Sequence, residues 1–262
     1  MSEDMLYVHY ETVSNYVLSK GIAVKDYTKL ARKLPENLLL KKKKKSIGTY
    51  DNHTGFQVIK GQENVKAFFQ KGTDNQTAMG KWIDFVNVDM LHLLTPIEIS
   101  EILYIAHAHT HLHSPFYYKL QNNYIYLTLT NGFIKMYYRY LEQFHELFAE
   151  AITVKLKEKV NEKKRFYQKD KEIAPFPIER VKEFIPIFKE GAVISFRQMS
   201  IEENTYCIPL FIAEDRYASI GGLSKSVGSD GFGTKYRYRT ETEQLDGENL
   251  PIDFAKNCES LG

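Results

Sequence analysis

The chain has 262 residues, of which 43% are hydrophobic and 26% are charged, and its formal net charge is +2. These proportions are ordinary for a folded protein with a buried core, and they exclude disorder along the whole chain. The sequence contains no run of about 18 apolar residues, and Met1–Asp4 is acidic where a signal peptide would be basic. We therefore expect a cytoplasmic protein with no membrane span.

The first 34 residues predict two short helices. Leu6, Val13 and Val17 recur at helical spacing within residues 5–20, and Gly21 stands where a glycine commonly ends a helix. A second helix is expected from about residue 26 to Leu34, because Pro35 cannot continue it. Two short helices joined by a turn also permit a helix-turn-helix interpretation, although most small helical pairs share this pattern.

Residues 46–88 alternate between strand and loop patterns. Residues 46–50 and 56–60 flank a polar turn and predict a β-hairpin, and residues 63–70 predict a short helix. Residues 72–80 are polar and bounded by glycine, so they predict a loop. Residues 82–88 alternate as a strand does, with Trp82 and Asp84 on one face and Ile83 on the other.

A helix is expected to begin at the sequence Thr95-Pro96-Ile97-Glu98. A threonine followed three residues later by glutamate is a capping box, in which each side chain bonds the other's backbone N–H. Pro96 supplies a suitable φ at the first helical position. Ser114-Pro115 favours an extended backbone, so the helix should end before it, after roughly four turns.

The segment Phe116-Tyr140 predicts a three-stranded β-meander. Its strands are expected at residues 116–120, 124–130 and 133–138. Between the last two strands stands Asn131-Gly132, the residue pair typical of a two-residue type I′ turn.

The second half predicts a long helix and then a smaller α+β region. Apolar residues step by three or four from Leu141 to Val160, and a shorter helix over residues 177–189 is expected to be disturbed at Pro186. The segment Ala192-Ala213 predicts two strands, and the acidic residues from Glu241 onward are expected to form a mobile tail. The fold class is therefore α+β. We expect a boundary near residue 172 that divides the chain into regions 1–172 and 173–262; alternatively, both regions form one continuous domain.

Four of the eight histidines stand close together at His107, His109, His111 and His113. On a helix they form two pairs at i,i+4 spacing, which suits a shared metal ion such as zinc or manganese. The sequence His-Thr-His-Leu-His-Ser resembles the opening metal-binding motif of amidohydrolases and of the polymerase and histidinol phosphatase type of metal-dependent hydrolases. The resemblance implies a barrel with further histidines and an aspartate downstream, whereas here only His145 follows. Two alternatives remain, namely surface histidines at a helix end and a role in pH sensing or acid–base catalysis.

Basic residues gather in two places. The run Lys41 to Lys45 includes Lys43 at its centre, and the stretch Lys155-Lys171 includes Lys163, Lys164 and Arg165. Such runs suit an anionic partner such as a nucleic acid, and they equally suit a solvated surface or the protected edge of a sheet.

No complete set of catalytic residues can be assembled from this sequence. The two cysteines, Cys207 and Cys258, lie far apart and provide neither a disulfide framework nor a four-cysteine zinc site. The leading hypothesis is a non-enzymatic interaction or regulatory protein with a protein partner. A metal-dependent hydrolase or metal-binding protein, and a nucleic-acid-binding protein, are the alternatives.

Overall fold

The structure is a computed structural model that describes residues 4–22, 34–40, 49–71, 80–105, 114–129, 132–162, 169–202 and 205–212, and the backbone of 235–236 and 252–253. The chain divides into two compact units. Unit 1 comprises Met1–Tyr10 and His145–Gly262, and unit 2 comprises Glu11–Phe144. Both units combine antiparallel strands with helices, so the predicted α+β class is confirmed.

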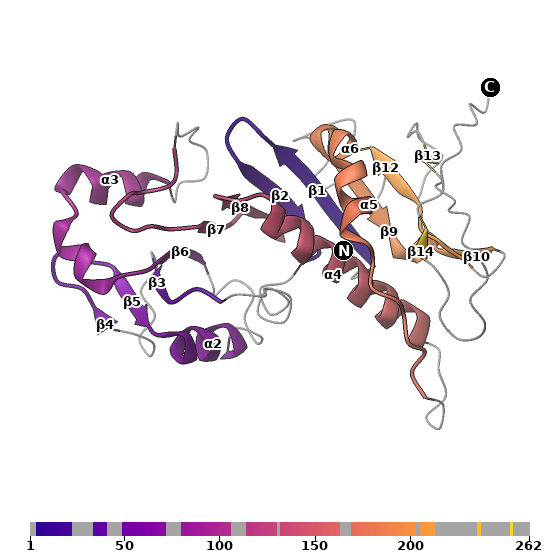
Figure 1. Cartoon of the computed structure of the whole chain (residues 1–262), viewed down its shortest axis with the longest axis horizontal. Helices are drawn as coiled ribbons and strands as arrows, with labels where there is room; N and C mark the ends of the chain where they lie inside the picture. Colours follow the sequence, from indigo (N-terminus) through magenta and orange to yellow (C-terminus); the bar gives the residue numbers. More distant parts are fainter. Residues whose placement is uncertain are drawn as a thin grey trace. The chain divides into compact units, whose positions relative to one another are not determined.

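Unit 2 contains an antiparallel sheet with the strand order β2-β8-β7-β6-β3-β5-β4 (Figure 1). The strands are β2 (Tyr16–Lys20), β3 (Asn37–Leu40), β4 (Thr49–Tyr50), β5 (Gln57–Lys60), β6 (Lys81–Phe85), β7 (Tyr124–Thr128) and β8 (Ile134–Tyr138). At the centre of the register, Leu39 of β3 lies between Val58 and Ile83. The strands expected near residues 56–60 and 82–88 are therefore present, the second ending at Phe85.

Helices cover both faces of this sheet (Figure 1). The helix α2 (Gln62–Lys71) packs on the face that carries Trp82, since the Phe69 and Trp82 ring centroids are 5.5 Å apart. The helix α3 (Pro96–Ile105) packs on the opposite face, where Ile102 and Ile83 line one crevice. Because successive side chains of a strand alternate between faces, both sides of β6 are buried.

The helix expected at residues 5–20 is wrong. These residues form β1 (Met5–Glu11) and β2, separated by a turn in which Asn15 has φ of 51°. All six residues from Met5 to Tyr10 are buried, and the stretch is rich in aromatic and branched side chains that suit a strand covered on both faces. The apolar residues at helical spacing were coincidental, since a fully buried strand carries apolar residues at every position. The second expected helix, at 26–34, lies mainly outside the described residues.

The first strand of the expected meander is also wrong, because residues 116–117 have no regular secondary structure and 118–121 form a turn; we call the segment 116–120 the turn at 116–120. The fully buried side chain of Asn122 explains this difference. Its Oδ1 accepts a hydrogen bond from the Tyr117 N–H at 2.8 Å, and its Nδ2 donates to the Pro115 carbonyl at 3.3 Å. An asparagine that bonds nearby backbone in this way competes with a strand ladder.

The register of β7 and β8 differs from the one that a two-residue turn at Asn131-Gly132 would give. Thr128 pairs with Ile134, and the Leu129 N–H donates to the Phe133 carbonyl at 2.7 Å, whereas a two-residue turn would pair Thr128 with Lys135. Residues 130 and 131 lie outside the described residues. Gly132 has φ of +76°. The positive φ expected of this glycine is therefore confirmed, and the pairing expected from a two-residue turn is wrong.

Replacing Gly132 with valine is expected to lower the free energy of unfolding by about 1–2 kcal/mol, because a β-branched residue resists positive φ. The backbone is the cause, since an added Cβ would meet only Lys20 Cε at an ordinary 3.8 Å. Urea unfolding measures the difference. Gly132→Asn is the control, because asparagine tolerates this conformation; equal losses in both variants would contradict the assignment.

Unit 1 contains strands in the order β13-β12-β9-β1 and a three-stranded sheet in the order β10-β11-β14. Its further strands are β9 (Ala192–Ser195), β10 (Ser200–Glu202), β11 (Thr205–Cys207), β12 (Leu210–Ile212), β13 (Lys235–Tyr236) and β14 (Ile252–Asp253). A short 3-10 helix, η5 (Phe196–Gln198), follows β9. Within its described residues, the segment expected to hold two strands therefore holds four, and β9 pairs with β12.

Three helices follow the strands of unit 2 along the chain: α4 (Glu142–Asn161), α5 (Ile178–Glu183) and α6 (Ile185–Glu190). The long helix matches the prediction for residues 141–160. The break expected from Pro186 is confirmed between α5 and α6, since proline has no N–H to donate within a continuous helix. In the core of unit 1, Tyr10 stacks on His145 of α4 at 5.8 Å and contacts Phe188 of α6 at 5.4 Å.

Candidate functional site

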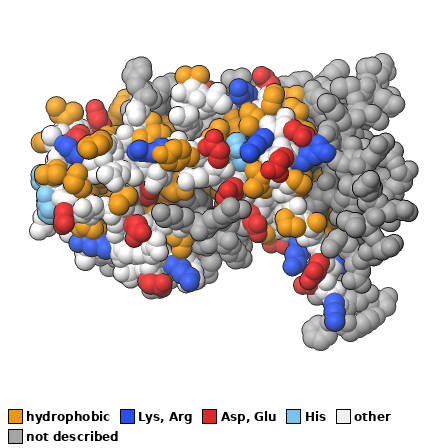
Figure 2. Space-filling view, viewed as in Figure 1, with side chains coloured by type: hydrophobic (Ala, Val, Ile, Leu, Met, Phe, Trp, Pro, Cys, Tyr) orange, Lys and Arg blue, Asp and Glu red, His pale blue; other side chains and the backbone are white. Residues whose placement is uncertain are grey.

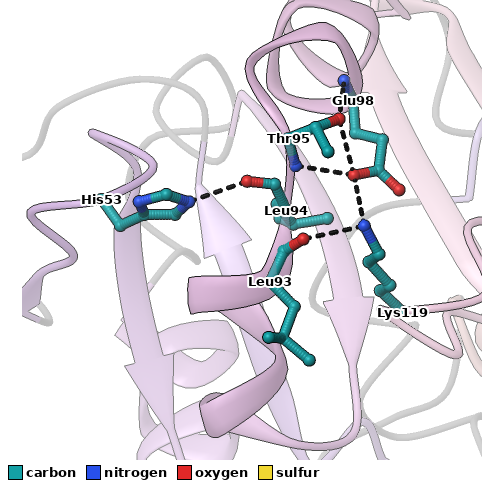
Figure 3. Close-up of polar contacts among 6 residues, drawn as sticks. All are labelled: His53, Leu93, Leu94, Thr95, Glu98 and Lys119. Carbon is teal, nitrogen blue, oxygen red and sulfur yellow. Dashed lines mark hydrogen bonds and ion pairs between the residues drawn. The ribbon is translucent and has the colours of Figure 1, made fainter.

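The candidate site is built around the start of α3, where the predicted capping box is present (Figure 3). The Thr95 N–H donates to Glu98 Oε2 at 2.7 Å, and the Glu98 N–H donates to Thr95 Oγ1 at 3.3 Å. The Thr95 hydroxyl also bonds Glu98 Oε2, at 2.8 Å. These bonds fix where the helix begins, because they occupy N–H groups that have no partner inside the helix.

Lys119 connects this helix start to the turn at residues 116–120 (Figure 3). Its Nζ donates to Glu98 Oε2 at 2.8 Å and to the Leu93 carbonyl at 2.7 Å. Leu93 is the last residue of the 3-10 helix η3 (Val88–Leu93), and the neighbouring Leu94 carbonyl bonds His53 Nε2 at 2.7 Å. Three segments distant in sequence are thus held together by a few polar contacts.

The Lys119 hydrogen bond, followed by the Thr95 N–H, lowers the pKa of Glu98 from 4.5 to about 2. A carboxyl group with a depressed folded-state pKa stabilises the fold above its unfolded-state pKa, and this stabilisation is lost as the pH falls from 4.5 toward 2. Glu98 is partly exposed, so solvent screening keeps its contribution modest.

Replacing Glu98 with glutamine is expected to lower the free energy of unfolding at neutral pH by about 1 kcal/mol, through the weakened cap and the lost ion pair. The difference from wild type should shrink below about pH 4 and be small near pH 2, because about half of the wild-type carboxyl groups are then protonated. Chemical unfolding across this pH range measures both effects. A difference that stays constant down to pH 2 would show that the charge of Glu98 is not involved.

Large apolar side chains are exposed around this same network. We call this region the η3–α3 surface, and it comprises Val86, Leu93, Ile97, Leu103, Tyr104 and Tyr118. Leu93 is 57% exposed, Ile97 72% and Tyr118 86%. Figure 2 shows hydrophobic side chains gathered over the end of unit 2 where Figure 1 places α3.

The polar network joins the segments that carry Val86, Leu93, Ile97 and Tyr118. Lys119, next to Tyr118, contacts both Leu93 and Glu98, and Glu98 follows Ile97. The Val86 N–H donates to the Leu120 carbonyl at 3.1 Å, which places Val86 beside the same turn. Single exposed apolar residues are common on proteins, whereas a group of them marks a candidate interaction site.

Acidic groups border this surface. Burial raises the pKa of Tyr117, and the nearby carboxylates of Glu101 and Glu98 raise it further. Asp89 is exposed on η3, and residues 86–105 contain no lysine or arginine. Since Lys119 already pairs with Glu98, the carboxylates of Glu101 and Asp89 give the surface a negative character.

Lys135 is a second group with unusual chemistry. It is a buried lysine on β8, and its Nζ lies 4.0 Å from the Tyr16 ring centroid and 5.0 Å from that of Tyr137. Burial lowers the pKa of Lys135 from 10.5 to about 8, with a smaller opposing effect from Glu11. A lysine of this kind suits nucleophilic chemistry only if a substrate reaches it. Here 6% of the residue is exposed, so the contacts fit a structural cation–π cluster.

Asp84 is a third such group, at the end of β6. Its carboxylate accepts hydrogen bonds from the Asn123 N–H at 2.9 Å and the Tyr124 N–H at 2.6 Å. Burial raises the pKa of Asp84 to about 7, although these donors act in the opposite direction. The carboxylate holds the start of β7 against β6, since its oxygens accept hydrogen bonds from the backbone of Asn123 and Tyr124 and from the side chain of Asn123.

Every site residue named from the sequence lies outside the described residues. This applies to His107, His109, His111 and His113, and to Lys41, Lys43, Lys45, Lys163, Lys164 and Arg165. Within the part of the chain that the structure describes, no three histidine, cysteine, aspartate or glutamate residues are placed to hold a metal ion. The zinc or manganese site and the anion-binding site therefore stay predictions.

The described beginning of the basic stretch Lys155-Lys171 contains lysines that contact acids. Lys159 Nζ lies 2.7 Å from Glu162 and 3.2 Å from Asp4, and Lys155 lies 3.9 Å from Glu158. These ion pairs favour the structural interpretation of this part of the helix, because paired lysines attract phosphate less strongly than isolated ones.

Comparison with known proteins gives only partial matches. No family model and no solved structure matches the chain. This chain is 34% identical over 85 residues to a 3D-(3,5/4)-trihydroxycyclohexane-1,2-dione hydrolase from Clostridium botulinum (strain Alaska E43 / Type E3). The matched residues make up 31% of this chain and 13% of that protein. The protein of the same name from Clostridium tetani (strain Massachusetts / E88) is 34% identical over 88 residues, or 32% of this chain and 14% of its own length. The chain thus matches about a seventh of these relatives.

Sequence reasoning identified the helix start but missed the surface around it. Leu93, Ile97 and Tyr118 have the residue types of a core, and nothing in their spacing marks them as exposed. The one available sign of this exposed surface was the composition of α3, which has apolar residues on more than one side.

None of the described helices has both the length and the hydrophobicity needed to cross a membrane.

Proposed function

We propose that this protein acts by binding another protein through the η3–α3 surface, without catalysing a reaction. The observation that carries the proposal is the exposure of Leu93, Ile97 and Tyr118 on three segments that the contacts of Lys119 join. Solvating such a group of apolar side chains is unfavourable, and burying it against a partner yields about 25 cal/mol for each Å² removed from water.

The rigidity of the surface supports the same proposal. The capping box and the Lys119 contacts hold η3, α3 and the turn at 116–120 in one arrangement before any partner arrives. A preorganised surface loses little conformational freedom on binding, so more of the contact energy contributes to affinity.

The other candidate functions have less support among the described residues. The buried Lys135 and Asp84 both contact their own fold, and they are only 6% and 4% exposed, which leaves little surface for a substrate to contact. The clostridial hydrolases share about a seventh of their length with this chain, so hydrolysis is not carried over to it.

A photo-crosslinking amino acid at position 97 tests the proposal. Expressed in its native cells, the variant is expected to form one dominant covalent adduct with another protein, which mass spectrometry would identify. The control carries the same amino acid at Val13, which is 91% exposed and lies in the turn after β1. No adduct at position 97, or the same set of adducts at both positions, would sink the proposal.

A further inference from the structure

The η3–α3 surface has a charge pattern as well as an apolar one, and the pattern restricts the partner. Glu101 is exposed one turn beyond Ile97 on α3, and Tyr104 follows one turn later. Residues at i, i+4 and i+7 lie on one side of a helix, so an acidic group stands between two apolar ones. Asp89 adds an exposed carboxylate on η3.

Within the described residues of η3 and α3, no lysine or arginine neutralises this pattern. Residues 86–105 contain no lysine or arginine, and Lys119 on the neighbouring turn already pairs with Glu98. Placing a carboxylate of a partner beside Glu101 would add repulsion, while a lysine or arginine would add attraction. Phosphates of nucleic acid and anionic lipid headgroups are disfavoured for the same reason.

From these observations we infer that the partner presents a basic amphipathic helix, whose apolar side chains cover Leu93, Ile97 and Tyr118 and whose lysines or arginines approach Glu101 and Asp89. The inference rests on the proposed function, since it names the partner of the same surface. The exposed side of α3 from Ile97 to Tyr104 spans about 10 Å, which corresponds to about two turns of a facing helix.

Two synthetic peptides test the inference. Both are about 18 residues long with the same leucine stripe, and they carry either lysine or glutamate at all other outward positions. Fluorescence anisotropy with the full chain measures each dissociation constant. The lysine peptide is expected to bind at least about tenfold more tightly than the glutamate peptide, and this preference should disappear at about 1 M salt, where the Debye length is about 3 Å.

Reversing the charge of a single residue tests whether the η3–α3 surface causes the preference for the lysine peptide. Glu101→Lys is expected to weaken binding of the lysine peptide by about fivefold or more, because one favourable contact becomes repulsive. Glu63→Lys makes the same change in net charge on α2, on the opposite face of the sheet, and is expected to change binding by less than about twofold. Equal effects of the two reversals would overturn the inference, since net charge and not the surface would then be responsible.

Ile97→Ser separates failure of the inference from failure of the proposed function. If this variant weakens neither peptide, the surface does not bind and both proposals fail. If it weakens both peptides alike and the two peptides bind equally, protein binding stands and the basic partner is refuted. Tighter binding to vesicles of phosphatidylcholine and phosphatidylserine in equal parts than to the lysine peptide would also overturn the inference, in favour of a lipid surface.

Discussion

Truncating Trp82 to alanine is expected to lower the free energy of unfolding by about 4 kcal/mol, among the largest effects of any single substitution in unit 2. Trp82 is 1% exposed at the centre of the sheet. Its ring stacks on Tyr126 with centroids 5.2 Å apart and meets Phe69 of α2 edge-on at 5.5 Å. Alanine would remove both contacts and leave a cavity that the surrounding strands fill only in part.

Urea unfolding of Trp82→Ala and Trp82→Phe measures this contribution. The phenylalanine variant keeps an aromatic ring between β7 and α2, so its loss should be about half as large or smaller. If both variants unfold at the wild-type urea concentration, the tryptophan does not join the sheet to α2.

Replacing Asp84 with alanine is expected to cost about 3 kcal/mol. The substitution leaves the backbone N–H groups of Asn123 and Tyr124 without the carboxylate that accepts their hydrogen bonds. Each buried donor that loses its partner costs about 1–3 kcal/mol. The start of β7 would then be held to β6 only by the strand pairing that begins at Ile125 and Ile83.

Thermal unfolding of Asp84→Ala and Asp84→Asn provides the measurement for this second substitution. Both backbone donors bond Oδ1, which asparagine can keep, but its NH₂ group would replace Oδ2, which lies 3.1 Å from the Asn123 N–H, so an intermediate loss is expected. Asp89→Ala is the matched control, because that exposed aspartate should change stability by less than about 0.5 kcal/mol. An Asp84→Ala protein as stable as the control would show that the carboxylate does not hold the two strands together.

Local sequence signals predicted those elements that local chemistry determines. The capping box at Thr95 and Glu98, the break at Pro186 and the positive φ at Gly132 each depend on a few neighbouring residues, and the structure contains all three. The long helix α4 was also predicted, because its apolar stripe continues over five turns and leaves no competing periodicity.

Elements that depend on tertiary burial were harder to predict. Residues 5–20 were assigned to a helix because a strand buried on both faces loses the alternation that normally identifies it. The turn at 116–120 depends on the single buried side chain of Asn122, which no periodic pattern marks. Likewise, the depth at which Asp84 and Lys135 are buried depends on strands far from them in sequence.

The candidate site likewise has one part that local sequence predicted and another part that depends on tertiary structure. Its polar frame at Thr95 and Glu98 was readable from the sequence, while Lys119, 21 residues away, was not. The exposure of Ile97 and Tyr118 could not be predicted from the sequence either, since an apolar residue type predicts burial. The histidines and lysines that stood out in the sequence lie outside the described residues, so the predictions made for them remain to be tested.

The contacts of Lys119 also have a consequence for local unfolding. Because one ammonium group holds both the Leu93 carbonyl and the Glu98 carboxylate, fraying of the first turn of α3 removes a support of the turn that carries Tyr118. Detachment of that turn in the same way weakens the helix start. Segments some 20 residues apart in sequence would therefore open and close as one small cooperative unit, whose stability can differ from that of the sheet beneath it.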